Sequence, residues 1–166
     1  MGKNIVLIGL PGSGKTTVGA LLARQLKKKL LDTDAMIEEK EKCSIPEIFA
    51  QKGEEYFRAV ETTCAKEAAR ERDAVIATGG GIVLKAENME ALEQNALVCF
   101  LDRSPRDIAQ NVDVSGRPLL KGQQEKIYQL HRDREPLYRK YAHGVYSGET
   151  PEEVAQAIAA AYERTE

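Results

Sequence analysis

A short glycine-rich segment limits most strongly what this chain can fold into. Residues 9–16 read G-L-P-G-S-G-K-T, directly after the apolar stretch 4–8 and directly before an amphipathic segment. They match G-x-x-x-x-G-K-[ST] at every fixed position, in the strand–loop–helix context that the motif requires. Its glycines let backbone N–H groups turn toward phosphate oxygens at the N-terminus of a helix. Lys15 would then reach the β- and γ-phosphates of a nucleotide and the Thr16 hydroxyl would coordinate Mg²⁺, whereas an ordinary glycine-rich turn with an incidental lysine is the weaker alternative.

Apolar runs and amphipathic segments alternate along the rest of the chain. We expect strands at 4–8, 30–32, 74–78, 96–101 and 143–146, with helices between them. Strands that are apolar nearly throughout are buried on both faces, and helical crossovers between them give a parallel α/β sheet. Ligands bind beyond the carboxyl ends of such strands, so we expect the functional residues just after each strand.

Local signals mark the ends of several helices. The first helix is expected at 15–28. Ser44 and Glu47 have the spacing of a capping box at the start of the second helix, which Gly53 is expected to interrupt before it continues to residue 72. Thr150 and Pro151 have the pattern of the N-cap and first residue of a last, alanine-rich helix.

Length and composition exclude several classes of protein. The chain has 166 residues, and we expect a single domain over 1–166. Its 24 basic and 26 acidic residues give a net charge of −2 and aromatic residues make up 5%, which argues against a nucleic-acid-binding surface. The apolar runs are too short to cross a bilayer. The three cysteines lack the spacing of a disulfide framework or metal site, as is typical of a reduced, cytoplasmic protein.

Two carboxylates follow the second expected strand, in L-L-D-T-D. Asp32 and Asp34 are two residues apart, so in an extended chain they face the same way and can share one site. Phosphoryl transfer needs a held metal ion and a positioned nucleophile, and we predict that Asp32 serves Mg²⁺ through water while Asp34 binds the acceptor hydroxyl. Asp34 also stands where the next helix begins, so capping that helix is its alternative role. Asp102 is interpreted as a strand exit and helix entry.

Two arginines are candidates for binding an anionic substrate. Arg58 and Glu61, in Y-F-R-A-V-E, have a spacing that lets them pair on one helix face. The plain interpretation, which the sequence alone favours, is a surface ion pair that stabilises little. The sharper hypothesis is that Glu61 orients Arg58 toward a bound carboxylate, which a guanidinium holds with two parallel hydrogen bonds. Arg134, in R-E-P-L-Y, poses the same choice.

Two further segments each have two interpretations. Thr78-Gly79-Gly80-Gly81 follows the third strand, where either close approach of the backbone to a ligand or a flexible loop explains the glycines. Residues 112–124, approximately, are polar and glycine-flanked, with Arg117 near the middle. They form either a lid that presents Arg117 to the developing charge or a solvated loop between helices.

In this order, the motifs L-L-D-T-D, F-R-A-V-E, T-G-G-G, R-P-L-L and R-E-P-L-Y make the chain resemble shikimate kinases over essentially its whole length. The resemblance implies an α/β fold of the three-layer P-loop NTPase type, with a five-stranded parallel sheet in the order 2-3-1-4-5 flanked by helices. It implies ATP-dependent phosphorylation of the 3-hydroxyl of shikimate, within chorismate and aromatic amino-acid biosynthesis. We expect a cytoplasmic monomer that uses Mg²⁺ and contacts small-molecule substrates but neither nucleic acid nor membrane.

The resemblance also assigns roles to residues of this chain. Shikimate would be held in a region spanning about 32–61 and by later residues, namely Asp34, Arg58, Gly80, Gly81 and Arg134, the two arginines taking its carboxylate. ATP would be held by the phosphate-binding loop at 9–17 and two arginines, with Arg106 against adenine: Gly12, Ser13, Gly14, Lys15, Thr16, Thr17, Arg106 and Arg117. Thr16 and Asp32 would serve Mg²⁺, and Lys15, Asp34 and Arg117 would be catalytic. Ser147 departs from the family's usual Asp in the adenine loop.

Three other functions fit parts of the pattern. A gluconate-type sugar-acid kinase would share the phosphate-binding loop and an anionic acceptor, but would not be expected to carry D-T-D, G-G-G and R-P-L-L together. A nucleotide-dependent switch without catalysis is opposed by the presence of Lys15, Asp34 and Arg117. A nucleic-acid ATPase is opposed by the acidic net charge and the scarcity of aromatic residues.

Overall fold

Five parallel strands form the centre of the molecule, in the order β2-β3-β1-β4-β5. The computed structural model describes residues 2–110 and 121–165. The strands are β1 (Asn4–Ile8), β2 (Lys29–Asp32), β3 (Ala74–Ala77), β4 (Ala96–Leu101) and β5 (Gly144–Tyr146). The predicted fold class and strand order are therefore confirmed, with strand ends that differ from the expected ones by one residue at β2, β3 and β5.

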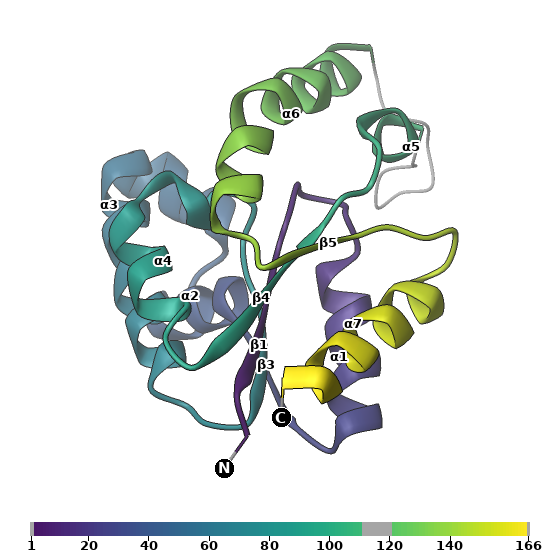
Figure 1. Cartoon of the computed structure of the whole chain (residues 1–166). Helices are drawn as coiled ribbons and strands as arrows, with labels where there is room; N and C mark the ends of the chain where they lie inside the picture. The colour runs from purple at the N-terminus through teal and green to yellow at the C-terminus, as the bar shows by residue number, and fades with distance from the viewer. Residues whose placement is uncertain (1, 111–120, 166) are drawn as a thin grey trace.

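Helices cover both faces of the sheet, giving three layers (Figure 1). One face is covered by α1 (Lys15–Leu26) and α7 (Pro151–Thr165), which lie side by side. The other is covered by α2 (Thr33–Glu41), α3 (Ile45–Ala69), α4 (Ala86–Leu92) and α6 (Lys121–Tyr141), with the short helices η1 (Ile82–Leu84) and α5 (Pro105–Ala109) in the connections. In the described part of the chain, no helix combines the length and the apolar character needed to cross a bilayer.

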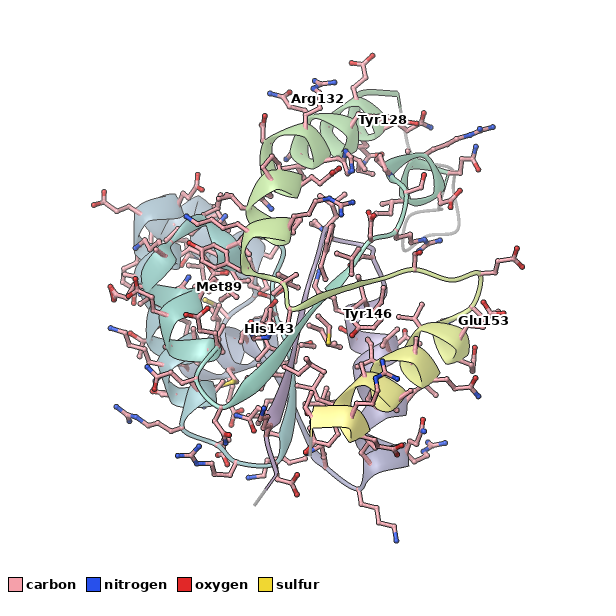
Figure 2. The ribbon with its side chains drawn as sticks, viewed as in Figure 1. Met89, Tyr128, Arg132, His143, Tyr146 and Glu153 are labelled. Carbon is pink, nitrogen blue, oxygen red and sulfur yellow. The ribbon has the colours of Figure 1, made fainter. Side chains whose placement is uncertain are left out.

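The central strand shows why the sequence requires helices on both faces. Successive side chains of β1 point to opposite faces, and all five of its residues are buried. Ile5 and Leu7 pack against residues of α1 and α7, whereas Val6 and Ile8 pack against residues of α3, α4 and α6. In Figure 2, Met89 lies between α4 and the sheet in this second layer. A strand that is apolar nearly throughout is expected to be buried on both faces. Removing these side chains from water on both sides stabilises the fold.

The predicted helix starts are confirmed, and the helix ends are less regular. Ser44 is the N-cap of α3, where its Oγ accepts a hydrogen bond from the Glu47 N–H at 3.3 Å. Gly53 breaks α3 with φ 85° and ψ 170°, as its place in the sequence predicted. Thr150 accepts from the Glu153 N–H at 3.2 Å at the start of α7. The helix expected to reach residue 72 ends at Ala69, and the one expected to reach residue 28 ends at Leu26.

Candidate active site

The loop after β1 has the backbone of a phosphate-binding site. Gly12 and Gly14 adopt φ 83° and φ 95°, a left-handed conformation that glycine reaches without steric cost. Gly14 is the N-cap of α1, and no side chain of the described residues caps this helix. The N–H groups of its first turn are therefore available to an anion, and the helix dipole favours negative charge there. Anions bind at helix starts with these two properties.

Lys15 is buried within this loop rather than extended into solvent. Its Nζ donates hydrogen bonds to the carbonyl oxygens of Gly9, at 2.6 Å, and Leu10, at 2.9 Å. Burial lowers the pKa of Lys15 to about 8, although the nearby carboxylates of Asp34 and Asp32 act in the opposite direction. The Lys15 ammonium is buried and donates to carbonyl oxygens. An anion bound nearby would stabilise its protonated form, so the site favours binding of a phosphate group.

A cleft of about 430 Å³ brings together the ends of three neighbouring strands. The loop after β1 supplies Lys15 and Thr16, the end of β2 supplies Asp32 and α2 supplies Asp34, and the turn after β3 supplies Gly80. Gly12, Gly14 and Thr17 line the same cleft, as the sequence predicted for the nucleotide phosphates. The candidate residues therefore lie together just beyond the carboxyl ends of three strands, where ligands bind in sheets of this kind.

Asp32 has a different role for each of its two carboxylate oxygens. Oδ1 caps α2 by accepting from the N–H groups of Asp34, at 2.9 Å, and Ala35, at 3.2 Å. Oδ2 accepts from the Thr16 hydroxyl at 3.4 Å. The capping role considered for Asp34 therefore belongs to Asp32, because the helix begins at Thr33, two residues earlier than a cap at Asp34 would require.

The Thr16–Asp32 pair suits Mg²⁺ by its donor chemistry. Both side chains offer hard oxygen donors, and Mg²⁺ is typically held by one or two protein ligands with water and substrate phosphates completing the shell. Among the described residues there is no cluster of three or more His, Cys, Asp or Glu side chains of the kind that would hold a metal without a nucleotide. The residues present thus fit an ion that enters with its phosphate ligand.

Residues 78–81, which follow β3, form a turn that contains Gly79, Gly80 and Gly81 and is called the glycine turn below. Asp34, in the first turn of α2, lies directly against it. A Cβ on Gly79 would lie only 2.5 Å from Asp34 Oδ1, so only glycine leaves room for this carboxylate. Partial burial raises the pKa of Asp34, and the neighbouring Asp32 raises it further, while Lys15 and Arg58 act against them. A half-buried carboxylate close to the Lys15 ammonium is suited to accept a hydrogen bond from a hydroxyl group.

Arg58 and Glu61 form a buried ion pair, so the interpretation as a surface pair is wrong. Arg58 Nη1 lies 2.9 Å from Glu61 Oε1, and the Glu61 side chain is 1% exposed against 14% for Arg58. A second carboxylate, Glu54, lies 3.4 Å from Arg58 Nε. Burial raises the pKa of Glu61, and its hydrogen bond with Arg58 opposes that shift. The physical reason for the burial is that α3 turns this face toward the turn after β3, which a helical spacing alone does not reveal.

The glycine turn is crowded, so the interpretation as a flexible loop is also wrong. A Cβ on Gly81 would lie 2.7 Å from Arg58 Cζ, and one on Gly80 would lie 2.7 Å from Pro11 Cδ and 3.3 Å from Arg134 Nη1. The turn therefore brings Arg58 and Arg134 to adjacent glycines. Among the described residues, Arg134 makes no direct ion pair with a carboxylate, although its positive charge acts to lower the pKa of the buried Glu61.

A second hollow, of about 160 Å³, adjoins the phosphate-binding loop. It is lined by Ser13, Val18, Arg103 and the segment from Tyr146 to Pro151, which includes Ser147. Arg103 donates a hydrogen bond to the Gly12 carbonyl oxygen at 2.9 Å. Arg106, expected against adenine, is exposed on α5 and lines neither hollow. Arg103 was not among the residues predicted from the sequence, although its position directly after β4 and Asp102 was a signal that could have indicated it.

Arg117 and most of the expected lid lie outside the described residues. The last residues of that segment, 121–124, begin α6. His131 and His143 line neither hollow.

Comparisons with known proteins identify the family. The family model for shikimate kinase matches residues 11–163. A shikimate kinase of Clostridium botulinum (strain Eklund 17B / Type B) is 45% identical over 159 residues, covering 95% of this chain and 96% of the relative. One of Moorella thermoacetica is 48% identical over 140 residues, covering 83% of this chain and 81% of the relative.

Solved structures agree with the family match. The shikimate kinase of Acinetobacter baumannii, solved in complex with shikimate, has a TM-score of 0.91 and 35% identity, covering 100% of this chain and 96% of that one. A gluconokinase from Sinorhizobium meliloti has a TM-score of 0.67 at 16% identity, covering 99% and 93% of the two chains, a likeness of fold alone. The chain described here belongs to the shikimate kinase family.

Proposed function

We propose that this protein transfers the γ-phosphoryl group of ATP to the 3-hydroxyl of shikimate, giving shikimate 3-phosphate and ADP in chorismate and aromatic amino-acid biosynthesis. The observation that carries the proposal is the convergence of the phosphate-binding loop, Asp34 and the buried Arg58–Glu61 pair around the glycine turn. Family membership and the likeness to an enzyme solved with shikimate support it.

The acceptor side offers two guanidinium groups and a carboxylate. We infer that Arg58 and Arg134 take the carboxylate of shikimate, because a guanidinium binds a carboxylate with two parallel hydrogen bonds. Glu61 fixes the orientation of Arg58 through their 2.9 Å contact. Gly80 and Gly81 supply backbone groups beside these arginines, and Asp34 holds the reacting hydroxyl from across the turn.

The donor side is the phosphate-binding loop, from Gly12 through Ser13, Gly14, Lys15 and Thr16 to Thr17. Mg²⁺, held by Thr16 and Asp32, would neutralise charge between the β- and γ-phosphates when bound. Lys15 supports the same charge, and Arg117 is proposed to do so from the lid. For the nucleoside, the hollow beside the loop favours Arg103 as the neighbouring cation rather than Arg106.

Positioning and charge stabilisation dominate phosphoryl transfer, because the transition state is loose. Asp34 therefore acts mainly by accepting a hydrogen bond from the attacking hydroxyl and fixing its direction. Its raised pKa makes it a better proton acceptor than an ordinary exposed aspartate. Lys15 and Arg117 remain the other catalytic residues of the proposal.

A coupled assay of ADP release tests the proposal directly. Shikimate, quinate, gluconate and nucleoside monophosphates are offered in parallel, with and without Mg²⁺, and Lys15→Met serves as the inactive control. Turnover with shikimate that requires Mg²⁺ and Lys15 is the expected result. Turnover only with gluconate or a nucleotide would overturn the substrate and keep the kinase class, and no acceptor-stimulated release would favour a nucleotide-dependent switch.

We further propose that the protein works as a single domain and a monomer in the cytoplasm. The three cysteines are free, as is typical of proteins in a reducing compartment. Sedimentation at the assay concentration tests the monomer.

A further inference from the structure

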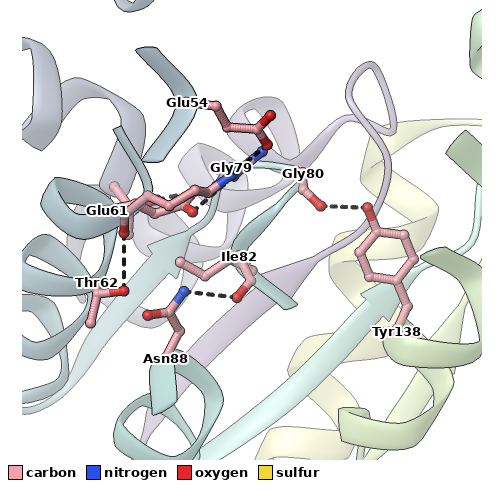
Figure 3. A network of polar contacts seen from close by, with 10 residues as sticks. Glu54, Glu61, Thr62, Gly79, Gly80, Ile82, Asn88 and Tyr138 are labelled. Carbon is pink, nitrogen blue, oxygen red and sulfur yellow. Dashed lines mark hydrogen bonds and ion pairs between the residues drawn. The ribbon is translucent and has the colours of Figure 1, made fainter. Parts of the chain in front are cut away.

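Three buried side chains from three different helices hold the glycine turn. The Thr33 Oγ1 accepts a hydrogen bond from the Gly79 N–H at 3.1 Å, and the Tyr138 hydroxyl donates to the Gly80 carbonyl oxygen at 2.6 Å. Asn88 Nδ2 donates to the Ile82 carbonyl oxygen at 3.0 Å. Figure 3 shows Tyr138 and Asn88 reaching the turn from different sides. Side-chain hydrogen bonds therefore hold the backbone at Gly79, at Gly80 and at Ile82, which directly follows the three glycines.

Of the three side chains, Tyr138 is the largest and is constrained by packing as well as by its hydrogen bond. Its side chain is fully buried, and its ring stacks on Phe100 of β4 with 5.1 Å between ring centroids. Burial raises the pKa of Tyr138 to about 12, so the hydroxyl keeps its proton and remains a donor throughout the pH range of an assay. Because the ring packing already fixes the side chain, the hydroxyl meets Gly80 at little further entropic cost.

The bond from Tyr138 also fixes the direction of the next backbone group. The described chain has no cis peptide bond, so the C=O of Gly80 and the N–H of Gly81 point in opposite directions across one plane. Holding the carbonyl on Tyr138 therefore aims the Gly81 N–H away from α6. Rotation of this peptide would be easy in a free glycine segment, and the bond to Tyr138 opposes it.

The same side chain is linked to one of the two arginines at the turn. Arg134 lies one helical turn before Tyr138 on α6 and hydrogen-bonds its side chain. Arg134 Nη1 comes within 3.3 Å of where a Cβ of Gly80 would lie. Tyr138 thus contacts a backbone group and a cation that face the same small space.

We propose that Tyr138 is a positioning residue for the phosphoryl acceptor: its hydroxyl holds the Gly80–Gly81 peptide and Arg134 in one fixed arrangement, with Thr33 and Asn88 holding the rest of the turn. The inference rests on the proposed function, in which the glycine turn lies against the bound phosphoryl acceptor. A tyrosine that merely fills the core would need its ring and not its hydroxyl, and that difference makes the two roles separable.

Tyr138→Phe keeps the ring and removes the hydroxyl. We expect the KM for shikimate to rise about tenfold, the typical effect of leaving a buried acceptor unpaired, while the KM for ATP stays within about twofold. Tyr162→Phe is the matched control, because Tyr162 is also buried and its hydroxyl accepts from Lys28 at 2.8 Å on the opposite edge of the sheet. That variant should lose stability without a change in either KM.

A second variant keeps the inference testable if Tyr138→Phe folds poorly. Thr33→Val removes the acceptor for the Gly79 N–H with almost no change of shape, and the same rise in the shikimate KM alone is expected. A folded Tyr138→Phe with wild-type KM for shikimate, or with equal rises in both KM values, would overturn the inference and leave the proposed function standing. A wild-type protein without shikimate-dependent ADP release would overturn both.

Discussion

At the scale of single residues, the three glycines after β3 make space rather than provide flexibility. None of them has a positive φ, so a larger residue could adopt the same backbone. What excludes a side chain is the neighbour that each one faces, namely Asp34 for Gly79, Pro11 for Gly80 and Arg58 for Gly81. Asp34 and Arg58, two side chains of the proposed site, therefore lie against glycine backbone with no side chain in between.

Gly81→Ala tests this at the acceptor side. Gly81 has φ −94° and ψ 8°, which alanine tolerates, so the added methyl group should act by displacing the Arg58 guanidinium. We expect a rise in the shikimate KM of about tenfold or more, with the KM for ATP unchanged. Arg58→Ala sets the upper limit. In a double-mutant cycle, Gly81→Ala should add little to Arg58→Ala, and full additivity would show that the methyl group acts elsewhere.

Asp34 connects activity and stability through its pKa, which burial raises above the ordinary value of 3.8. Because the ionised form accepts the hydrogen bond of the hydroxyl, kcat/KM should fall as pH decreases through this raised pKa. Asp34→Asn should lower kcat by about 10²–10⁴ and abolish that acidic limb. A pH–rate profile of the two proteins measures both effects, and an unchanged limb in the variant would assign it to another group.

The same shift predicts the direction of a stability change. A carboxyl whose pKa is higher in the folded than in the unfolded state binds more protons when folded, so stability decreases as pH rises through that interval. At neutral pH the folded protein therefore bears the cost of the ionised Asp34. Asp34→Asn should melt at a higher temperature than the wild type at pH 7, and calorimetry without ligands would show whether it does.

At the scale of elements, α3 is two helices joined at Gly53. Phe49 and Phe57 lie eight residues apart, which in a straight helix means about 12 Å along the axis. Their ring centroids are only 4.7 Å apart, so the kink at Gly53 brings side chains of the two segments into contact. The second segment carries Arg58 and Glu61, and the contact across the break helps to fix it.

Gly53→Ala distinguishes this break from a helix that merely contains a glycine. The site has open space for a Cβ, but φ 85° with ψ 170° is a region that only glycine adopts readily. We expect a loss of about 1–3 kcal/mol in the free energy of unfolding by urea. Gly122→Ala is the control, because it also has open space and lacks a positive φ, and it should stabilise by about 0.5 kcal/mol. A stabilised Gly53→Ala would mean that α3 can straighten.

Elements whose signals are local were predictable from the sequence, and contacts between elements were not. Ser44 and Thr150 act within three residues of themselves, so their capping roles needed no knowledge of the fold. The burial of Glu61, the capping by Asp32 and the place of Arg103 depend on where other elements pack. Tyr138 was missed for the same reason, since its partner Gly80 is 58 residues earlier in the chain.

At the scale of the whole molecule, the residues at the carboxyl ends of the strands and those at the amino ends have different functions. The proposed site lies at the carboxyl ends of the strands, and a polar cluster at the amino ends joins elements that are distant in sequence. Lys28 donates to the Lys3 carbonyl oxygen at 3.0 Å and to the Tyr162 hydroxyl at 2.8 Å, and it pairs with Asp73. Its Nζ also lies 4.3 Å from the centroid of the Tyr162 ring. One side chain thus fastens the C-terminal helix α7 to the starts of β1 and β3.

Lys28→Met should therefore separate stability from activity. The Lys28 side chain is 2% exposed, so methionine keeps the apolar packing and leaves the carbonyl and hydroxyl without their donor. The expected loss is about 1–3 kcal/mol, or roughly 3–10 °C in melting temperature, while kcat below the melting range stays within about twofold. Lys29→Met is the control, because its pair with Glu71 at 3.0 Å is exposed and should be worth less than about 1 kcal/mol. If Lys28→Met instead lowered kcat while the protein remained folded, the two ends of the strands would be coupled, and the division of functions between them would be wrong.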